Sequence, residues 1–367
     1  MTDVVVVGAG VVGASVAWHL GKLGVRDVLL LEREPAPGQG STGRATGGFR
    51  AQFSTEINVR LSLLAREKLR RFRDETGVDP GYAPCGYLWL ARTEEQLAAL
   101  RRAQDVQRAA GLGEARMLDA SEIRAVNPAV RVEGLAGAAF CPTDGFIRPP
   151  EILRGYLQGA RVRTGVDVVG FRRGAAGRIE KVLTASEEIP AGCVVNAAGP
   201  WAAEVARHAG IDLPVAPLRR HVAVTAETAA LPADMPMTIW VEDGFHVRVR
   251  DGRVLLLMPG EGEGWRAAVE RCAAERVVGL GDVPVESTYS GFYEMSPDGH
   301  AILGRAPGCE NFFLANGSSG HGVMHAPALG QLVAEMIAQG EARAIDARAL
   351  RPSRFAEGRP NPSSGLL

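Results

Sequence analysis

Three glycines and one acid near the N-terminus have the spacing of a dinucleotide-binding motif. Gly8, Gly10 and Gly13 follow the β-branched run 4–7 and precede a helical pattern. Glycines at these positions permit a tight turn and let the backbone approach a pyrophosphate, whose charge rests on the helix N-terminus. Glu32 ends the next apolar run and can accept hydrogen bonds from ribose hydroxyls, which disfavours a 2′-phosphate. The sequence therefore predicts a bound NAD or FAD rather than NADP.

Three further segments favour FAD, because an isoalloxazine ring needs contacts from distant parts of a chain. Residues 41–50 read STGRATGGFR, with small residues that let backbone approach a flat ring and with two arginines. Residues 196–201 read NAAGPW before a helix, and residues 316–322 read NGSSGHG. Backbone amides of the last loop can stabilise negative charge on a reduced flavin.

We expect the cofactor contacts to come from these four segments. The predicted contact residues are Gly8, Gly10, Val12, Gly13, Glu32, Arg33, Ser41, Thr42, Arg44, Ala45, Gly47, Gly48, Ala198, Gly199, Trp201, Gly317, Ser319, Gly320, His321 and Gly322.

Parallel strands must carry these loops. The run 4–7 is typical of a strand buried on both faces, a helix of about twelve residues follows, and 28–31 is the next strand, which makes a βαβ start. Apolar runs at 193–196 and 312–315 predict two more strands of this domain, and the second leads into a helix over 324–337.

An antiparallel meander is predicted between residues 219 and 259. Apolar runs at 221–225, 238–241, 245–249 and 254–258 form the strands, and Asp-Gly turns separate the last three. Such a sheet is suited to form the wall of a substrate pocket.

Composition narrows the class of protein. The 367 residues suit two domains, and 46% hydrophobic with 23% charged residues is ordinary for a globular chain. A net charge of -1 provides no field for nucleic acid or an anionic membrane, so the expected partner is a small molecule. The five cysteines have no metal-ligand spacing, so we expect reduced thiols and no metal site.

The location is predicted to be cytoplasmic. The N-terminus has no basic leader and no small-residue cleavage site. No apolar run reaches the roughly 20 residues that a bilayer span needs, so we expect no membrane insertion.

The chain resembles the FAD-dependent D-amino-acid oxidase superfamily, most of all its sarcosine, glycine and dimethylglycine oxidase branch. The match spans nearly the whole chain and rests on GAGVVG with Glu32, GRATGGFR, NAAGPW, GFYEMSPDG and GSSGHGVMHAPALGQL, in this order. The resemblance implies an α/β protein (α+β overall) in which a Rossmann-type FAD domain is interleaved with an antiparallel-sheet substrate domain. It implies oxidation of a small secondary or primary amino acid, of the sarcosine, proline or glycine type, by hydride transfer to flavin.

The expected domain bounds follow from the pattern of strands. Residues 1–76, 150–212 and 300–351 are assigned to the FAD-binding domain, and residues 77–149 and 213–299 to the substrate domain. Residues 352–367 are expected to be a disordered tail.

Two departures from the resembled family concern flavin attachment and oxygen. The family's cysteine and histidine that bind flavin covalently correspond to Gly291 and Ala45, which predicts noncovalent FAD. The family's two active-site lysines fall near Leu256 and at Met324, and no lysine follows Lys181. A cation beside the flavin stabilises superoxide, so its loss favours a dehydrogenase over an oxidase.

Four residues are candidates for substrate binding and catalysis. A substrate carboxylate needs a cation, and Arg50 matches the family's arginine after the flavin loop. Arg248 lies on a meander strand, and alternation places it on the same face as His246. His246 can orient the substrate or tune amine ionisation, and Tyr293 matches a family active-site tyrosine.

Two alternatives to a self-contained enzyme stay open. The chain can be the flavin subunit of a heteromeric amine dehydrogenase that passes electrons to a partner subunit or acceptor. It can also be a flavin-binding assembly factor without turnover, since a similar GGxRxQF loop occurs in such proteins and here reads GGFRAQF.

Overall fold

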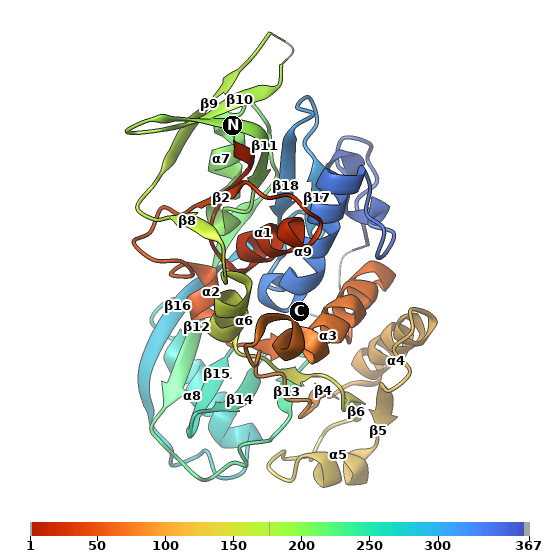
Figure 1. Ribbon diagram of the computed structural model, residues 1–367. Coiled ribbons are helices and arrows are strands. Elements are labelled where there is room, and N and C mark those ends of the chain that lie inside the picture. Colours follow the sequence, from red (N-terminus) through yellow and green to blue (C-terminus); the bar gives the residue numbers. More distant parts are fainter. Residues whose placement is uncertain (1, 176, 363–367) are drawn as a thin grey trace.

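The computed structural model describes residues 2–175 and 177–362, whose strands form two eight-stranded sheets and a two-stranded sheet of β3 (Gly48–Phe49) and β7 (Gly145–Phe146). The two large sheets occupy opposite halves of the molecule (Figure 1). This mixed α/β architecture confirms the predicted fold class.

The first sheet has the order β17-β18-β11-β1-β2-β8. Its parallel core comprises β1 (Thr2–Val7), β2 (Val28–Leu31), β8 (Arg161–Arg163), β11 (Glu188–Asn196) and β18 (Phe312–Asn316). Antiparallel strands extend it: β17 (Ile302–Arg305), β10 (Ile179–Thr184) and β9 (Val168–Arg173). Val4 to Val7 are buried, as predicted for a central strand with both faces covered.

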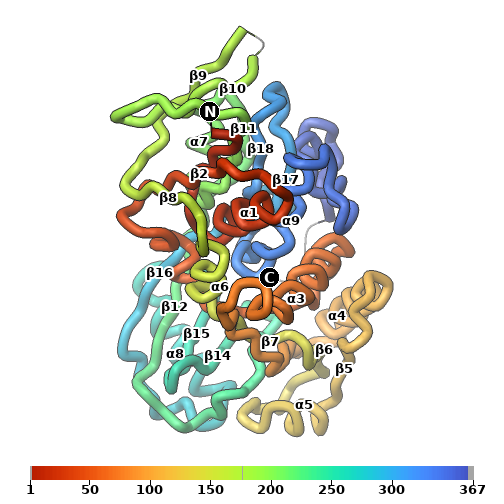
Figure 2. The backbone as a smooth tube through the Cα atoms, in the orientation of Figure 1, coloured from red at the N-terminus to blue at the C-terminus, as the bar shows by residue number. Residues whose placement is uncertain are grey.

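Helices cover both faces of this sheet. On one face, α1 (Val11–Lys22), α3 (Glu56–Thr76) and α9 (Gly322–Gln339) pack together, and on the other lies α7 (Ala202–His208). Figure 2 shows that α1 and α9 lie side by side although they come from opposite ends of the chain. A Cβ at Gly330 would stand 2.1 Å from Ser15 Oγ, so this crossing requires glycine.

The second sheet has the order β16-β12-β15-β14-β13-β4-β6-β5. Its strands are β4 (Tyr87–Ala91), β5 (Arg116–Leu118), β6 (Gly137–Cys141), β12 (Ala216–Thr225), β13 (Met237–Trp240), β14 (His246–Arg250), β15 (Arg253–Leu257) and β16 (Val285–Met295). Strands β13, β14 and β15 form a meander as predicted, whereas β12 pairs with β15 and not with the next strand β13. Strand β16 was not predicted, since its polar edge sequence VESTYSGFYEM lacks an apolar run.

The two faces of this sheet differ. One packs on α8 (Trp265–Arg276) and α5 (Ala120–Val126) in a core that includes Leu256, Val247 and Ala223. The opposite face carries Val222, Leu257, His246 and Ile239 in adjacent register positions. These four residues line the cavity described below.

The remaining elements lie outside the two large sheets. They are α2 (Ser41–Arg44), β3 (Gly48–Phe49), α4 (Glu94–Ala109), β7 (Gly145–Phe146), α6 (Pro149–Tyr156), η1 (Gly199–Trp201), η2 (Arg348–Leu350) and η3 (Pro352–Arg354). None of the helices in the described part of the chain combines the length and apolar character that a bilayer span requires. All five cysteines are free thiols.

The prediction of a disordered tail is wrong for residues 352–362. Arg354 is fully buried, and Asn361 donates to Asp298 from both its backbone and its side chain. The pairing of Arg354 with Asp298 explains this order, because a buried ion pair with full hydrogen bonding fixes the segment. Residues 363–367, also part of that prediction, lie outside the described residues.

Candidate active site

A cavity of about 310 Å³ is bounded by both sheets and by all four predicted cofactor segments. Of the 24 residues predicted from the sequence, all line it except Gly13, Gly317, Arg44 and Arg248. The tertiary structure therefore brings together segments from both ends of the chain.

The glycine loop after β1 presents backbone to this cavity. Gly8 has a φ of +103°, and a Cβ there would stand 2.5 Å from the carbonyl oxygen of Ala197. Gly13 lies behind the loop, where its own Cβ would meet Gly8 O at 2.0 Å. Side chains are thus excluded at both positions, which leaves room for a pyrophosphate at the start of α1.

Glu32 and Thr42 hold this loop from the cavity side. Glu32 accepts hydrogen bonds from the amides of Ala9 at 2.9 Å and Glu34 at 3.0 Å. Thr42 Oγ1 accepts from the amide of Val11 at 3.1 Å and so supplies an N-terminal cap to α1 from a distant loop. The carboxylate of Glu32 keeps free lone pairs for ribose hydroxyls, so the residues present fit the adenosine half of FAD.

An arginine–tryptophan stack forms the wall beside Glu32. The guanidinium of Arg33 lies 4.2 Å from the ring centroid of Trp201, and both residues line the cavity. Gly199, at a φ of +54°, begins the short η1 turn that positions Trp201.

The loop 41–50 joins the first sheet to β16. Ser41 Oγ donates to the carbonyl of Phe292 at 2.7 Å, and Arg44 Nη1 donates to the carbonyl of Ser290 at 3.1 Å. Arg44 is exposed and outside the cavity, so the prediction that it contacts flavin is not supported by its position. Its guanidinium instead fixes the loop against the sheet.

The loop 317–322 has a strained backbone that β16 supports. Ser319 adopts a φ of +49°, and Gly320 a φ of +89°, where a Cβ would stand 2.5 Å from the ring of Tyr293. Glu294 accepts from the amide of Ser318 through Oε1 at 3.2 Å and from the amide of Ser319 through its carbonyl at 2.9 Å. Gly317 serves the turn at a φ of +68° and packs against Ser296 and Ile302 outside the cavity.

Arg50 is a buried cation that lines the cavity. Its Nη2 lies 3.0 Å from His321 Nε2, and its guanidinium stacks 4.6 Å from the Phe53 ring centroid and 4.8 Å from that of Trp89. Burial lowers the pKa of Arg50, yet an arginine remains charged at neutral pH. A cation held among aromatic rings in a cavity is suited to bind a carboxylate.

His246 and Tyr293 provide neutral polar groups beside Arg50. Burial lowers the pKa of His246 to about 4, and its Nδ1 donates to the carbonyl of Gly244 at 2.8 Å. The imidazole is therefore neutral near pH 7, which leaves Nε2 as an acceptor. Burial also raises the pKa of Tyr293, so its phenol keeps its proton.

Arg248 shares its strand face with His246, as β14 alternation predicted, but lies behind the cavity wall. Only 6% of its surface is exposed, and its guanidinium stacks 4.1 Å from the Phe146 ring centroid. A Cβ on Gly47 would meet Arg248 Nη1 at 2.9 Å. Arg248 thus supports the loop 41–50 from the side away from the cavity and does not line the cavity.

Polar residues of the cavity that sequence reasoning missed include Tyr87, Arg220 and Glu294. Arg220 stands two residues before Val222 on β12, so strand alternation could have found it. Glu294 was missed because β16 has no clear strand signal, and Tyr87 was assigned only to a strand. Burial raises the pKa of Glu294 to about 7.

The positions of the absent lysines are apolar. Met324 and Leu257 line the cavity, and the side chain of Leu256 belongs to the core on the opposite sheet face. Gly291 and Ala45, which also line it, offer no nucleophile for a bond to flavin. No group of three or more histidine, cysteine or acidic side chains arranged to hold a metal occurs among the described residues.

Known proteins with similar sequences include an FAD-dependent oxidoreductase domain-containing protein, a glycine oxidase and a sarcosine dehydrogenase. "FAD-dependent oxidoreductase domain-containing protein 1" of Bos taurus is 30% identical, with 96% of this chain and 85% of that protein covered. Glycine oxidase of Geobacillus kaustophilus is 28% identical, with 92% and 93% covered. Mitochondrial sarcosine dehydrogenase of Mus musculus is 28% identical over 92% of this chain but only 40% of its own length.

Solved structures have the same fold. L-proline dehydrogenase from P. horikoshii superposes with a TM-score of 0.91 at 26% identity and covers 98% of this chain and 99% of its own. The Geobacillus kaustophilus glycine oxidase structure has a TM-score of 0.84 at 25% identity, with 96% and 98% covered. Residues 3–336 match the family described as "FAD dependent oxidoreductase" (DAO), so this chain is an FAD-dependent oxidoreductase of the DAO family.

Proposed function

We propose that the protein oxidises the C–N bond of a small amino acid with a secondary or primary amine. The observation that carries this proposal is the placement of buried Arg50 in the same cavity as the flavin-binding segments. The similar proteins include a sarcosine dehydrogenase, a glycine oxidase and an L-proline dehydrogenase. The amino acids in these names support a substrate of this size and class.

Different residues of the cavity bind different parts of the substrate. Arg50 binds the substrate carboxylate, and Tyr293 and neutral His246 orient the amine beside it. Apolar side chains of Val222, Leu257 and Ile239 exclude water from the reacting carbon. Bound FAD supplies the acceptor for the two electrons removed from the substrate.

We propose further that the natural electron acceptor is another molecule or subunit instead of oxygen. Of the two lysines of the resembled oxidases, one falls at Met324 and the other near Leu256, so neither position supplies an ammonium to stabilise superoxide. Reduced protein should therefore react slowly with oxygen and quickly with an artificial acceptor such as dichlorophenolindophenol. A second polypeptide that copurifies would identify a heteromeric dehydrogenase.

Anaerobic mixing of the FAD-loaded protein with a panel of small amino acids tests the proposed reaction. Bleaching of the flavin absorbance by at least one secondary or primary amino acid is the expected result. A flavin that no amine of the panel reduces would instead support the non-catalytic flavin-binding role.

A further inference from the structure

Arg220 is a second cation of the substrate cavity. It lies on β12 opposite Gly291 of β16, on the sheet face that also carries Val222. Its side chain is partly exposed and lines the cavity. Among the described residues it has no hydrogen-bond or ion-pair partner, and its guanidinium stands 5.8 Å from the ring centroid of Tyr293.

Arg50 and Arg220 face the same two neutral groups. After burial, which has the largest effect, the positive charges of both arginines lower the pKa of His246. Burial raises the pKa of Tyr293, and the same two charges act against that rise. Both arginines, His246 and Tyr293 line the same cavity, so the two cations share it with the two neutral groups.

The acids of the cavity do not neutralise Arg220. Glu32, Glu34 and Asp167 lie with the adenosine-binding segments, and Glu294 accepts the amide of Ser318 through Oε1. The walls around Arg220 are apolar, with Val222 and Leu257 nearby in the sheet. A cation in such surroundings is stabilised by an anionic group of the ligand.

We propose that Arg220 binds a second carboxylate of the substrate, carried on its side chain or on the substituent of its amine. This inference rests on the proposed function, in which Arg50 binds the first carboxylate. The substrate would then be an amino dicarboxylate, with its amine between two arginines and beside His246 and Tyr293. A planar guanidinium matches a carboxylate with two parallel hydrogen bonds.

Two unreactive ethers test this inference without any need for turnover. Methoxyacetate has one carboxylate and the shape of sarcosine, and diglycolate has a second carboxylate at the other end. Each is titrated into the FAD-loaded protein, and binding is followed by the change in flavin absorbance. The variants are Arg220→Met, Arg220→Lys and, as a matched control, Arg219→Met, whose exposed side chain is outside the cavity.

Diglycolate should bind at least about tenfold more tightly than methoxyacetate, because a charge-assisted pair contributes that much. Arg220→Met should abolish this preference and leave methoxyacetate affinity unchanged, Arg220→Lys should restore part of it, and Arg219→Met should keep it. Equal affinities in the unaltered protein, or equal losses for both ethers in Arg220→Met, would overturn the inference. Loss of FAD from Arg220→Met would also overturn it, since Arg220 would then hold cofactor.

The proposed function fails on a different result. If diglycolate binds through Arg220 but no amine reduces the flavin, the site assignment stands and the oxidation does not.

Discussion

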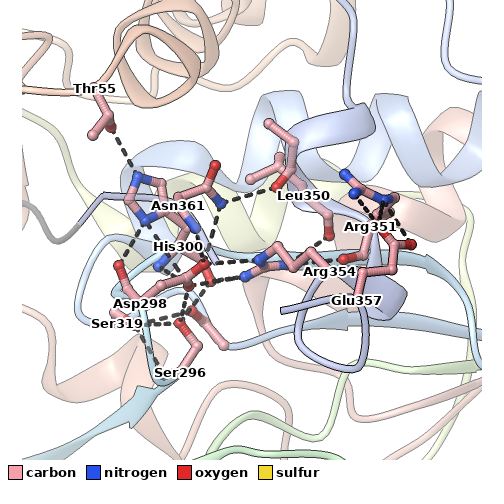
Figure 3. A network of polar contacts seen from close by, with 12 residues as sticks. Thr55, Ser296, Asp298, His300, Ser319, Leu350, Arg351, Arg354, Glu357 and Asn361 are labelled. Atoms are coloured by element: carbon pink, nitrogen blue, oxygen red, sulfur yellow. Dashed lines mark hydrogen bonds and ion pairs between the residues drawn. The ribbon is translucent and has the colours of Figure 1, made fainter. Parts of the chain in front are cut away.

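Asp298 and Arg354 form a bidentate ion pair in the interior, with Nε to Oδ2 at 2.8 Å and Nη2 to Oδ1 at 2.9 Å (Figure 3). Ser296 Oγ donates to Asp298 and lies 3.2 Å from Ser319 Oγ in the loop 317–322. The chain near the C-terminus is thereby connected to the cofactor site through buried polar groups. Burial acts to raise the pKa of Asp298, but the hydrogen bonds from Arg354 hold this pKa below its usual value.

Replacing Arg354 should weaken both the fold and FAD binding. Arg354→Met leaves Asp298 as a buried unpaired charge, and we expect a loss of about 3–5 kcal/mol in the free energy of unfolding. The control is Arg351→Met, which removes a partly exposed pair with Glu357 and should cost at most about 1 kcal/mol. Denaturant unfolding and equilibrium dialysis of FAD measure the two effects. If folded Arg354→Met protein bound FAD with unchanged affinity, the segment around Arg354 would have no influence on the loop 317–322.

Gly13→Ala should abolish FAD binding. The new Cβ would stand 2.0 Å from the carbonyl oxygen of Gly8, so the backbone of the glycine loop must move. Gly21→Ala in the same helix is the matched control, since nothing lies within 4 Å of its Cβ. That control should stabilise the helix by about 0.5–1 kcal/mol. Flavin content after purification and thermal unfolding check both results, and a fully yellow Gly13→Ala protein would contradict the assigned role.

Arg50→Ala should weaken binding of carboxylate substrates. Loss of a charge-assisted contact corresponds to about 2–3 kcal/mol, or roughly a 30- to 150-fold higher Kd. Arg60→Ala, an exposed arginine of α3 paired with Glu56, should leave the Kd unchanged. Anaerobic flavin titration with the reducing amino acid gives the Kd, and Arg50→Lys separates charge from fork geometry. An unchanged Kd in Arg50→Ala would remove Arg50 from carboxylate binding.

Glu294 should make the stability of the FAD-free protein depend on pH. Burial raises its pKa from 4.5 to about 7, so between these values the folded chain holds a proton that the unfolded chain releases. The free energy of unfolding should therefore decrease as pH rises through this window, by up to roughly 3 kcal/mol. Glu294→Gln should flatten this slope, whereas Glu286→Gln, on an exposed part of β16, should not. Denaturant unfolding at several pH values provides the measurement.

FAD should be released intact when the protein is precipitated with acid. Gly291 and Ala45 line the cavity and provide no nucleophilic atom for a covalent bond to the flavin. We expect all yellow colour in the supernatant after trichloroacetic acid treatment. Colour that stays in the pellet would show a covalent bond from another residue.

The sequence by itself determined the nucleotide-binding half and most of the cofactor segments. The signals are the glycine spacing, a buried strand and an acid at the end of the next strand. All three lie within a short stretch of chain, so local sequence patterns suffice to predict this half. The Asp-Gly turns likewise determined the meander. Sequence alternation also placed Arg248 and His246 on one face, but alternation does not show which of the two reaches a cavity.

Only the tertiary structure decided which polar groups line the cavity. Strand β16 pairs with β12 along its length, and this long-range pairing brings Glu294 and Tyr293 beneath a loop and Arg220 beside them. The burial of Arg354 depends on Asp298, 56 residues away, and no local pattern specifies such a partner. Charge and burial at these positions result from contacts between distant segments. The two-residue alternation of a strand assigns a residue to one face of a sheet, but it does not specify which distant segment packs there.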